Sequence, residues 1–235
     1  MKWRVEGTSY PVLRVDLEEG EKVYAEAGAL MMLKGNVKVE TKILDLEKDG
    51  KLKGLLDALG RKVLAGETIF HNVFEGPGTV WLSPSLPGSI AHVKTEGKCW
   101  IVQDYSYMAH YGDLDIDVAW KGPKGLALGD LVWLRVCGEG GFWVSSYGEI
   151  MEVELKEGEK MVIDNMHFVT LPDDAKWEVK KFGDMKSFLF GGEGYVVEVT
   201  GPTKVLVQTR ILPPLAAAIA RFMPSKWAEL LRLRI

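Results

Sequence analysis

The chain has 235 residues, of which 47% are apolar and 26% charged, and its formal net charge is −4. Because a general nucleic-acid binder needs a basic surface to displace the counterions of the phosphates, this charge excludes that class, and we expect no nucleic-acid partner. The longest apolar runs are much shorter than the roughly 20 residues of a membrane-spanning helix, so no span is predicted.

The N-terminal residues Met1–Glu6 lack the apolar stretch of a signal peptide. The two cysteines, Cys99 and Cys137, do not make a disulfide framework and lack the CxxC spacing. These features predict a reducing, cytoplasmic location, with Cys137 as a buried structural cysteine. Asn and Gln are scarce while Lys and Glu are abundant, a balance typical of thermophilic proteins because amides deamidate when hot.

Two short sequence marks recur in the same order along the chain. The first is a charged turn centred on a glycine, and it occurs at Leu17–Val23, Lys94–Trp100 and Leu155–Met161. The second is a glycine turn that leads into an apolar strand, and it occurs at Phe74–Leu82, Val136–Val144 and Val199–Val207. Since both marks recur in phase, the pattern favours three copies of one β-unit, although glycine turns also resemble one another in unrelated β-proteins.

Strands within these units are indicated by alternation. In Val37–Ile43, apolar or β-branched residues alternate with charged ones, and Asp113–Val118 alternates in the same way. Period-two alternation places one face of a strand on a core and the other in water. Short strands separated by Gly and Pro turns predict an all-β fold of the sandwich or double-stranded β-helix type. Trp81 and Trp143 occupy equivalent repeat positions and are expected in the core.

The predicted organisation is one all-β domain over residues 1–212. It consists of three repeats in a pseudo-threefold arrangement, at about 12–90, 91–152 and 153–212. A helical insertion at about 49–65 lengthens the first repeat. No stretch rich in Pro, Ser and Gly divides this body, so we expect a single domain rather than linked modules.

Residues 213–235 are predicted to form a short amphipathic helical tail, with one helix over Leu215–Met223 and a second after Pro224. A basic and aromatic segment of this kind docks on a protein partner or lies peripherally on an anionic membrane. The alternative is that it packs on the protein's own sheet or on a neighbouring subunit, since an apolar stripe needs burial. The candidate contact residues of the tail are Arg221, Phe222, Lys226, Trp227, Arg232 and Arg234.

Three segments resemble motifs of a known family. Phe74–Pro84 resembles its F-x-G-P-G-x-V-W-L strand entry, Gly201–Arg210 its closing G-P-x-x-V-x-x-Q-T-R, and Ala65–Phe70 its A-G-E-x-x-F segment. The family holds prokaryotic proteins of unassigned activity and relatives of the mitochondrial biogenesis protein named for altered inheritance of mitochondria. The resemblance covers about residues 1–212 and implies a fold similar to that of the tryptophan RNA-binding attenuation protein, without catalytic residues. Tryptophan and RNA binding do not carry over, because a shared fold does not fix function.

We find no catalytic, metal-binding or cofactor-binding pattern in the sequence, and we expect no cofactor. The four histidines have neither HExxH nor His-x-His spacing, and isolated histidines on strands are most often hydrogen-bonding residues of the core. No G-x-S-x-G motif marks a nucleophile. The densest aromatic stretch is the best candidate wall for a small ligand, and its residues are Tyr105, Tyr107, His110 and Tyr111.

These observations do not specify a biochemical function. The favoured interpretation is a non-catalytic scaffold or interaction protein that self-associates as a homo-oligomer, because the repeated β-unit carries no convergent polar chemistry. One alternative is a small-ligand-binding β-barrel that uses the aromatic stretch. A second alternative is an enzyme whose site is assembled from distant strands, which requires at least two titratable groups together in a pocket.

Overall fold

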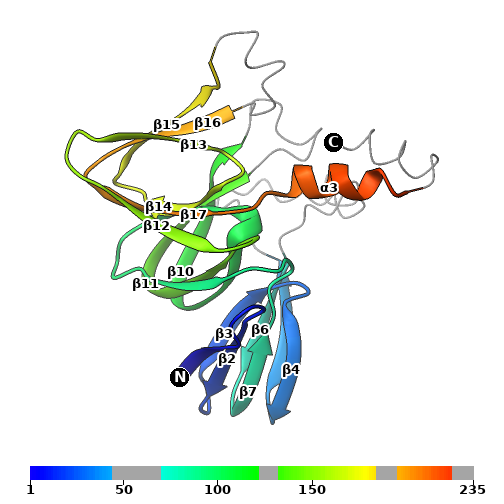
Figure 1. Cartoon of the computed structure of the whole chain (residues 1–235). Helices are drawn as coiled ribbons and strands as arrows, with labels where there is room; N and C mark the ends of the chain where they lie inside the picture. Colours follow the sequence, from blue (N-terminus) through cyan, green and yellow to red (C-terminus); the bar gives the residue numbers. More distant parts are fainter. Residues whose placement is uncertain (44–69, 122–131, 184–194, 224–235) are drawn as a thin grey trace, which may run out of the picture.

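The computed structural model describes residues 1–43, 70–121, 132–183 and 195–223. Within them the chain is built almost entirely from strands, which confirms the all-β prediction (Figure 1). The strands are β1 (Lys2–Glu6), β2 (Val12–Leu17), β3 (Lys22–Glu26), β4 (Leu30–Gly35), β5 (Lys38–Ile43), β6 (Phe70–Glu75), β7 (Gly78–Leu82), β8 (Ile90–Lys94), β9 (Trp100–Gln103), β10 (Tyr107–Lys121), β11 (Val132–Ser145), β12 (Ile150–Leu155), β13 (Lys160–Asp164), β14 (Phe168–Pro172), β15 (Lys176–Lys181), β16 (Tyr195–Thr200) and β17 (Thr203–Gln208). A 3-10 turn, η2 (Asp104–Ser106), precedes β10, and a helix, α3 (Leu212–Ala220), follows β17.

The described strands form three sheets with antiparallel pairing. A four-stranded sheet has the order β1-β2-β7-β4, and a three-stranded sheet has the order β13-β16-β15. The largest sheet has the order β12-β17-β14-β9-β11-β10-β3-β6-β5, with β8 added along β11. In Figure 1 the four-stranded sheet lies at one end of the molecule and the three-stranded sheet at the other, with the long strands β10 and β11 between them. The largest sheet therefore connects the two ends.

Alternation along the strands determines where the cores lie. In β2, Leu13, Val15 and Leu17 are buried, and the residues between them face outward. The buried side chains of the described residues gather in three hydrophobic clusters, centred on Phe74, Phe142 and Phe168. The three clusters meet along β11, which contributes Trp143 to the first, Phe142 to the second and Trp133 to the third.

The turns at Gly76 and Gly201, in the predicted first and third repeats, make the same backbone contacts. The N–H of Gly76 donates to the carbonyl oxygen of Glu21 (3.0 Å), and the N–H of Gly201 donates to that of Glu159 (2.8 Å). A Cβ atom at either glycine would lie 2.2 Å from a backbone oxygen, so only glycine fits at both positions. This close approach explains why glycine recurs at the two turns. The threefold repeat over residues 1–212 stays a prediction.

Cys99 and Cys137 form a disulfide, which the sequence did not indicate. Strands β9 and β11 pair so that Trp100 lies opposite Val136, and the two cysteines are the next residues along this ladder. The register of the pairing therefore brings together residues that are 38 positions apart in the sequence. The prediction of two unpaired cysteines is wrong, and the cytoplasmic location loses the support that it drew from them.

The tail begins as a helix earlier than predicted. Helix α3 starts at Leu212, with Pro213 and Pro214 in its first turn, where proline costs no backbone hydrogen bond. It ends at Ala220 instead of Met223. The helical insertion at about 49–65 and the tail from residue 224 lie outside the described residues. None of the helices that the structure describes is long and apolar enough to cross a membrane.

The disulfide gives a first testable prediction. Because Cys99 and Cys137 are 38 residues apart, closing this loop restricts the unfolded chain and stabilises the protein by about 3–4 kcal/mol. We expect reductant to lower the urea midpoint of the wild-type chain, and the variant Cys99→Ser to have the lower midpoint with or without reductant. Equal wild-type midpoints in the two conditions would contradict the predicted contribution.

Candidate functional site

Three strands of the largest sheet bring titratable and aromatic side chains together. Tyr24 and Glu26 come from β3, His71 from β6, and Tyr107 and His110 from β10. The register places Glu26 opposite His71 and Tyr24 opposite His110. Residues directly opposite each other in an antiparallel pair share one face of the sheet. We call these five residues the tyrosine–histidine cluster.

The rings of the cluster pack closely against one another. Tyr24 stacks on His110, with ring centroids 4.6 Å apart and an interplanar angle of 4°. His71 stacks on Tyr107 at 5.3 Å and lies 5.6 Å from the ring of His110. The hydroxyl of Tyr107 hydrogen-bonds to Nδ1 of His110. Four aromatic rings from three strands thus form one contiguous group inside the sheet.

Burial keeps both histidines of the cluster neutral. It lowers the pKa of His71 to about 4 and that of His110 to about 3, with a further lowering of the latter by His71. Burial also raises the pKa of Tyr107, as does the nearby Glu26. Tyr107 therefore keeps its proton at neutral pH, and its hydroxyl is hydrogen-bonded to a neutral His110. Nε2 of His71 is buried and has no hydrogen-bond partner among the described residues.

Glu26 connects the tyrosine–histidine cluster to the surface. Burial raises its pKa to about 7, a hydrogen bond from Ser85 lowers it, and the charge of Asp104 raises it. The carboxyl group is therefore close to half-ionised at neutral pH. Oγ of Ser85 donates to Oε1 of Glu26 at 3.4 Å. Ser85 also lines a cleft of about 180 Å³, whose other lining residues are Tyr10, Pro11, Ser83, Pro84, Leu86, Pro87 and Gly88.

The four residues that were predicted to line a ligand site do not lie together in the structure. Tyr107 and His110 belong to the cluster, while Tyr105 lies on η2 and is 53% exposed. Tyr111 stacks on His92 at 5.8 Å, on the opposite side of β10. The register shift between Tyr107 and Ala109 breaks the alternation of the strand. Tyr107 and His110 therefore lie on the same face of the sheet, and Tyr111 lies on the other face.

The expectation of isolated histidines is wrong for His71 and His110, which converge. Sequence reasoning missed Tyr24, Glu26 and His71 because they lie on strands far from the aromatic stretch. Their proximity depends on the pairing of β3 with β6 and β10, and no local pattern reports that pairing. Among the described residues, no three His, Cys, Asp or Glu side chains lie together in a way that could hold a metal ion.

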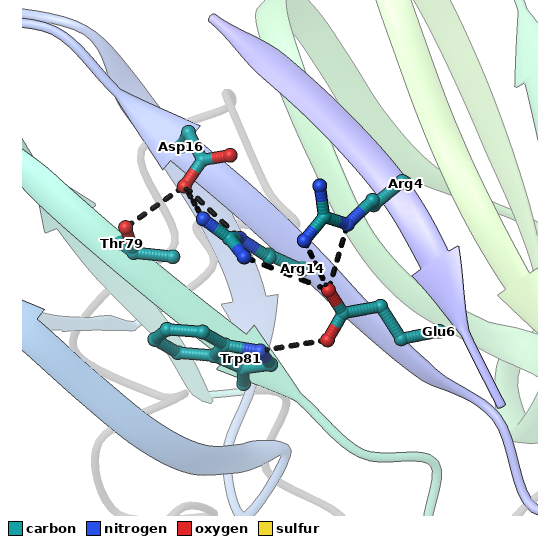
Figure 2. A network of polar contacts seen from close by, with 6 residues as sticks. All are labelled: Arg4, Glu6, Arg14, Asp16, Thr79 and Trp81. Carbon is teal, nitrogen blue, oxygen red and sulfur yellow. Dashed lines mark hydrogen bonds and ion pairs between the residues drawn. The ribbon is translucent and has the colours of Figure 1, made fainter.

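A second polar group covers the outer face of the four-stranded sheet (Figure 2). Arg14 donates to Asp16 at 2.9 Å and lies 5.1 Å from the ring centroid of Trp81. Nε1 of Trp81 donates to Glu6 at 3.1 Å, so this tryptophan is not a core residue, in contrast to the buried Trp143. The other residues of the group are Arg4 and Thr79. Within this group, ion pairs with Glu6 and Asp16 balance the charges of Arg4 and Arg14.

The exposed edge of the same sheet is apolar. Strand β4 pairs with β7 and with no other described strand. The exposed fractions of Leu30, Met31, Met32 and Leu33 are 40%, 53%, 44% and 40%. Leu30 and Leu33 lie opposite the fully buried Leu82 and Val80, while Met32 lies opposite Trp81 on the outer face. Strand β4 is therefore apolar on both faces. We call Leu30–Leu33 the β4 edge.

The described part of the tail has no fully buried residue. Helix α3 has no buried residue, and Figure 1 shows it leading away from the sheets. Phe222 is 89% exposed, and Arg221 is exposed beside it. The docking of residues 212–223 on the protein's own sheet is thus not observed. The remaining tail candidates, Lys226, Trp227, Arg232 and Arg234, lie outside the described residues.

The neutral histidines make stability depend on pH. An unfolded His71 would bind a proton below pH 6.5, whereas the folded one does so only near pH 4, so acid favours unfolding in this interval. The free energy of unfolding of the wild-type protein should therefore fall by about 3 kcal/mol between pH 6.5 and pH 4 because of His71. We expect the variant His71→Phe, which keeps a ring against Tyr107, to lack this part of the fall. Urea denaturation of both proteins at several pH values measures this. Parallel pH profiles would contradict the assignment.

Comparisons with known proteins show to which proteins this chain is related. It is 27% identical over 225 residues to an uncharacterized protein of Streptococcus pyogenes serotype M6, and the match covers 92% of this chain and 88% of that protein. A crystal structure of a Streptococcus pyogenes protein from a structural genomics consortium has a similar fold, with a TM-score of 0.76 and 24% identity over 94% of this chain and 99% of that chain. Residues 3–210 match the profile of the Mitochondrial biogenesis AIM24 family, which confirms the resemblance of the sequence motifs, and the chain therefore belongs to that family.

Proposed function

We propose that this protein is a non-catalytic scaffold that associates with further copies of itself, and that the β4 edge is the contact. The observation that carries the proposal is the run of four exposed apolar residues, Leu30–Leu33, on a strand with one described partner. A second copy of the chain is a partner for this edge that is always present, at the concentration of the protein itself. Closed homo-oligomers are also the commonest assemblies of soluble proteins.

The β4 edge differs from an ordinary edge strand. Edge strands are normally protected by charges, because their open backbone groups pair readily with other chains. Strand β5, at the edge of the largest sheet, has that protection, since Lys38 and Glu40 alternate with Val39 and Thr41. In strand β4 the residues Leu30–Leu33 are apolar on both faces, and the charged residue Lys34 comes after this run. This contrast supports β4, and not β5, as the associating edge.

The apolar side chains of the β4 edge supply part of the free energy that a contact needs. Complete burial of a Leu or Met side chain contributes about 1.5–3 kcal/mol, and each of these four side chains is roughly half exposed. Each would therefore contribute about 1 kcal/mol, or about 8 kcal/mol for the eight side chains of two copies. This is close to the free energy of a micromolar complex, about 8 kcal/mol, before the cost of association is subtracted.

The chemistry of the tyrosine–histidine cluster supports a non-catalytic role. His71 and His110 are only 3% and 5% exposed, and burial holds both in the neutral form. The hydroxyl of Tyr107 is engaged by His110. A substrate would need direct access to at least one such group. The rings instead contact one another and join β3, β6 and β10, which is a structural contribution to the sheet.

Self-association through the β4 edge predicts contrasting effects of two matched substitutions. Met31 and Val39 are exposed to similar extents, 53% and 50%, on the edges of two different sheets. We expect Met31→Lys to weaken association at least tenfold, because each contact would have to bury two added charges, and Val39→Lys to leave association unchanged. Native mass spectrometry and light scattering over a micromolar concentration range measure the oligomer.

Circular dichroism and urea denaturation show whether both variants are folded. A wild-type chain that stays monomeric throughout the concentration range would overturn the proposed scaffold. Equal weakening by Met31→Lys and Val39→Lys would show that the contact is not specific to β4.

A second candidate function is the binding of a small molecule in the cleft beside Ser85. The observation that favours it is Glu26, a partly buried carboxyl group that receives a hydrogen bond from the cleft and has Asp104 near it. Glu26 is hydrogen-bonded to a residue that lines the cleft, and its carboxyl group favours a neutral or cationic ligand over an anion. This candidate keeps the ligand-binding alternative but moves its centre from the aromatic stretch to Glu26.

The ligand hypothesis predicts a bound species in gently purified protein. We expect native mass spectrometry to show an added mass that Glu26→Gln reduces and Glu154→Gln retains, because both changes remove one carboxylate but only the first alters the cleft. Absence of any added mass, together with no thermal shift across a library of small amines and neutral metabolites, would contradict this candidate.

A further inference from the structure

We infer that two copies of this chain pair antiparallel along β4, about a two-fold axis perpendicular to the sheet, with Leu30 of one copy opposite Leu33 of the other and Met31 opposite Met32. The inference rests on the proposed self-association and specifies its geometry. It concerns the register and the symmetry of the contact, which the exposed run alone leaves open.

The faces of the sheet determine this register. Leu30 and Leu33 continue the inner rows of the four-stranded sheet, opposite Leu82 and Val80. A two-fold axis perpendicular to the sheet keeps inner faces together and outer faces together, so a leucine must meet a leucine. Placing the axis between Met31 and Met32 satisfies this condition, and it gives every residue of the run an apolar partner.

Charge argues against the other edge as the partner of β4. Strand β1 is also an edge strand, and its apolar residues Trp3 and Val5 lie on the inner face of the sheet. Aligning Leu33 with Trp3 of another copy places Lys34 opposite Lys2, and aligning it with Val5 places Lys34 opposite Arg4. Like charges directly opposite each other destabilise a pair of strands.

The two-fold register avoids that repulsion. It places Lys34 of each copy opposite Ala29 of the other, and the two lysines lie five positions apart along the strand direction, or about 17 Å. The contact uses the single β4 of each copy, so it closes at two chains. The two four-stranded sheets then form one continuous sheet in the order β1-β2-β7-β4-β4-β7-β2-β1.

Disulfide cross-linking between two variants tests the register. Opposed residues in antiparallel strands have Cα atoms about 4.5–5.5 Å apart, within the range that a disulfide spans. We expect a mixture of Leu30→Cys and Leu33→Cys chains to form a mixed cross-linked dimer on mild oxidation. Each variant alone should not cross-link, because its two cysteines would lie about 10 Å apart. Both native cysteines are already paired, so the introduced thiol is the reactive one.

The outcomes separate this inference from the proposed scaffold. A wild-type oligomer whose Leu30→Cys and Leu33→Cys chains do not cross-link would overturn the two-fold register and leave self-association in place. Cross-linking of either variant with itself, in preference to the mixture, would indicate a different register and overturn the inference as well. A wild-type chain that is monomeric at every concentration would overturn both.

Discussion

The pairing of β10 with β11 is the interaction on which the rest of the structure depends. These two strands pair from Tyr107 to Lys121, and β11 also pairs with β8 and β9, while β10 pairs with β3. In the order of the largest sheet, this ladder joins the strands on the β9 side to those on the β3 side. The tyrosine–histidine cluster lies on its β3 side, and the disulfide lies on its β9 side. Loss of this ladder would separate the four-stranded end from the three-stranded end.

Two of the departures from regular alternation coincide with chemically distinctive places. The register shift after Tyr107 brings its hydroxyl to His110, and the shift after Leu30 precedes the exposed methionines of β4. Regular strands such as β2 simply divide their residues between core and solvent. An irregular strand can present two neighbouring positions to one side, which a strictly alternating strand cannot do.

Much of the fold follows from the sequence, because alternation and turn residues act locally. The all-β class, the family and the glycine turns at Gly76 and Gly201 were predictable on that basis. The Cys99–Cys137 pair, the meeting of His71 with His110, and the outward position of Trp81 were not. Each of these depends on which strands are neighbours and in which register, and such long-range pairing leaves no mark in a short segment.

The disulfide has a mechanical consequence for the chain when it is under tension. When the two ends of the molecule are pulled apart, force passes through the covalent bridge and bypasses the residues between Cys99 and Cys137. A bypassed segment of 38 residues withholds about 130 Å of contour length that would otherwise be released on extension. That segment includes all of β10 and the start of β11, so these residues are shielded from tension that reaches the flanking strands.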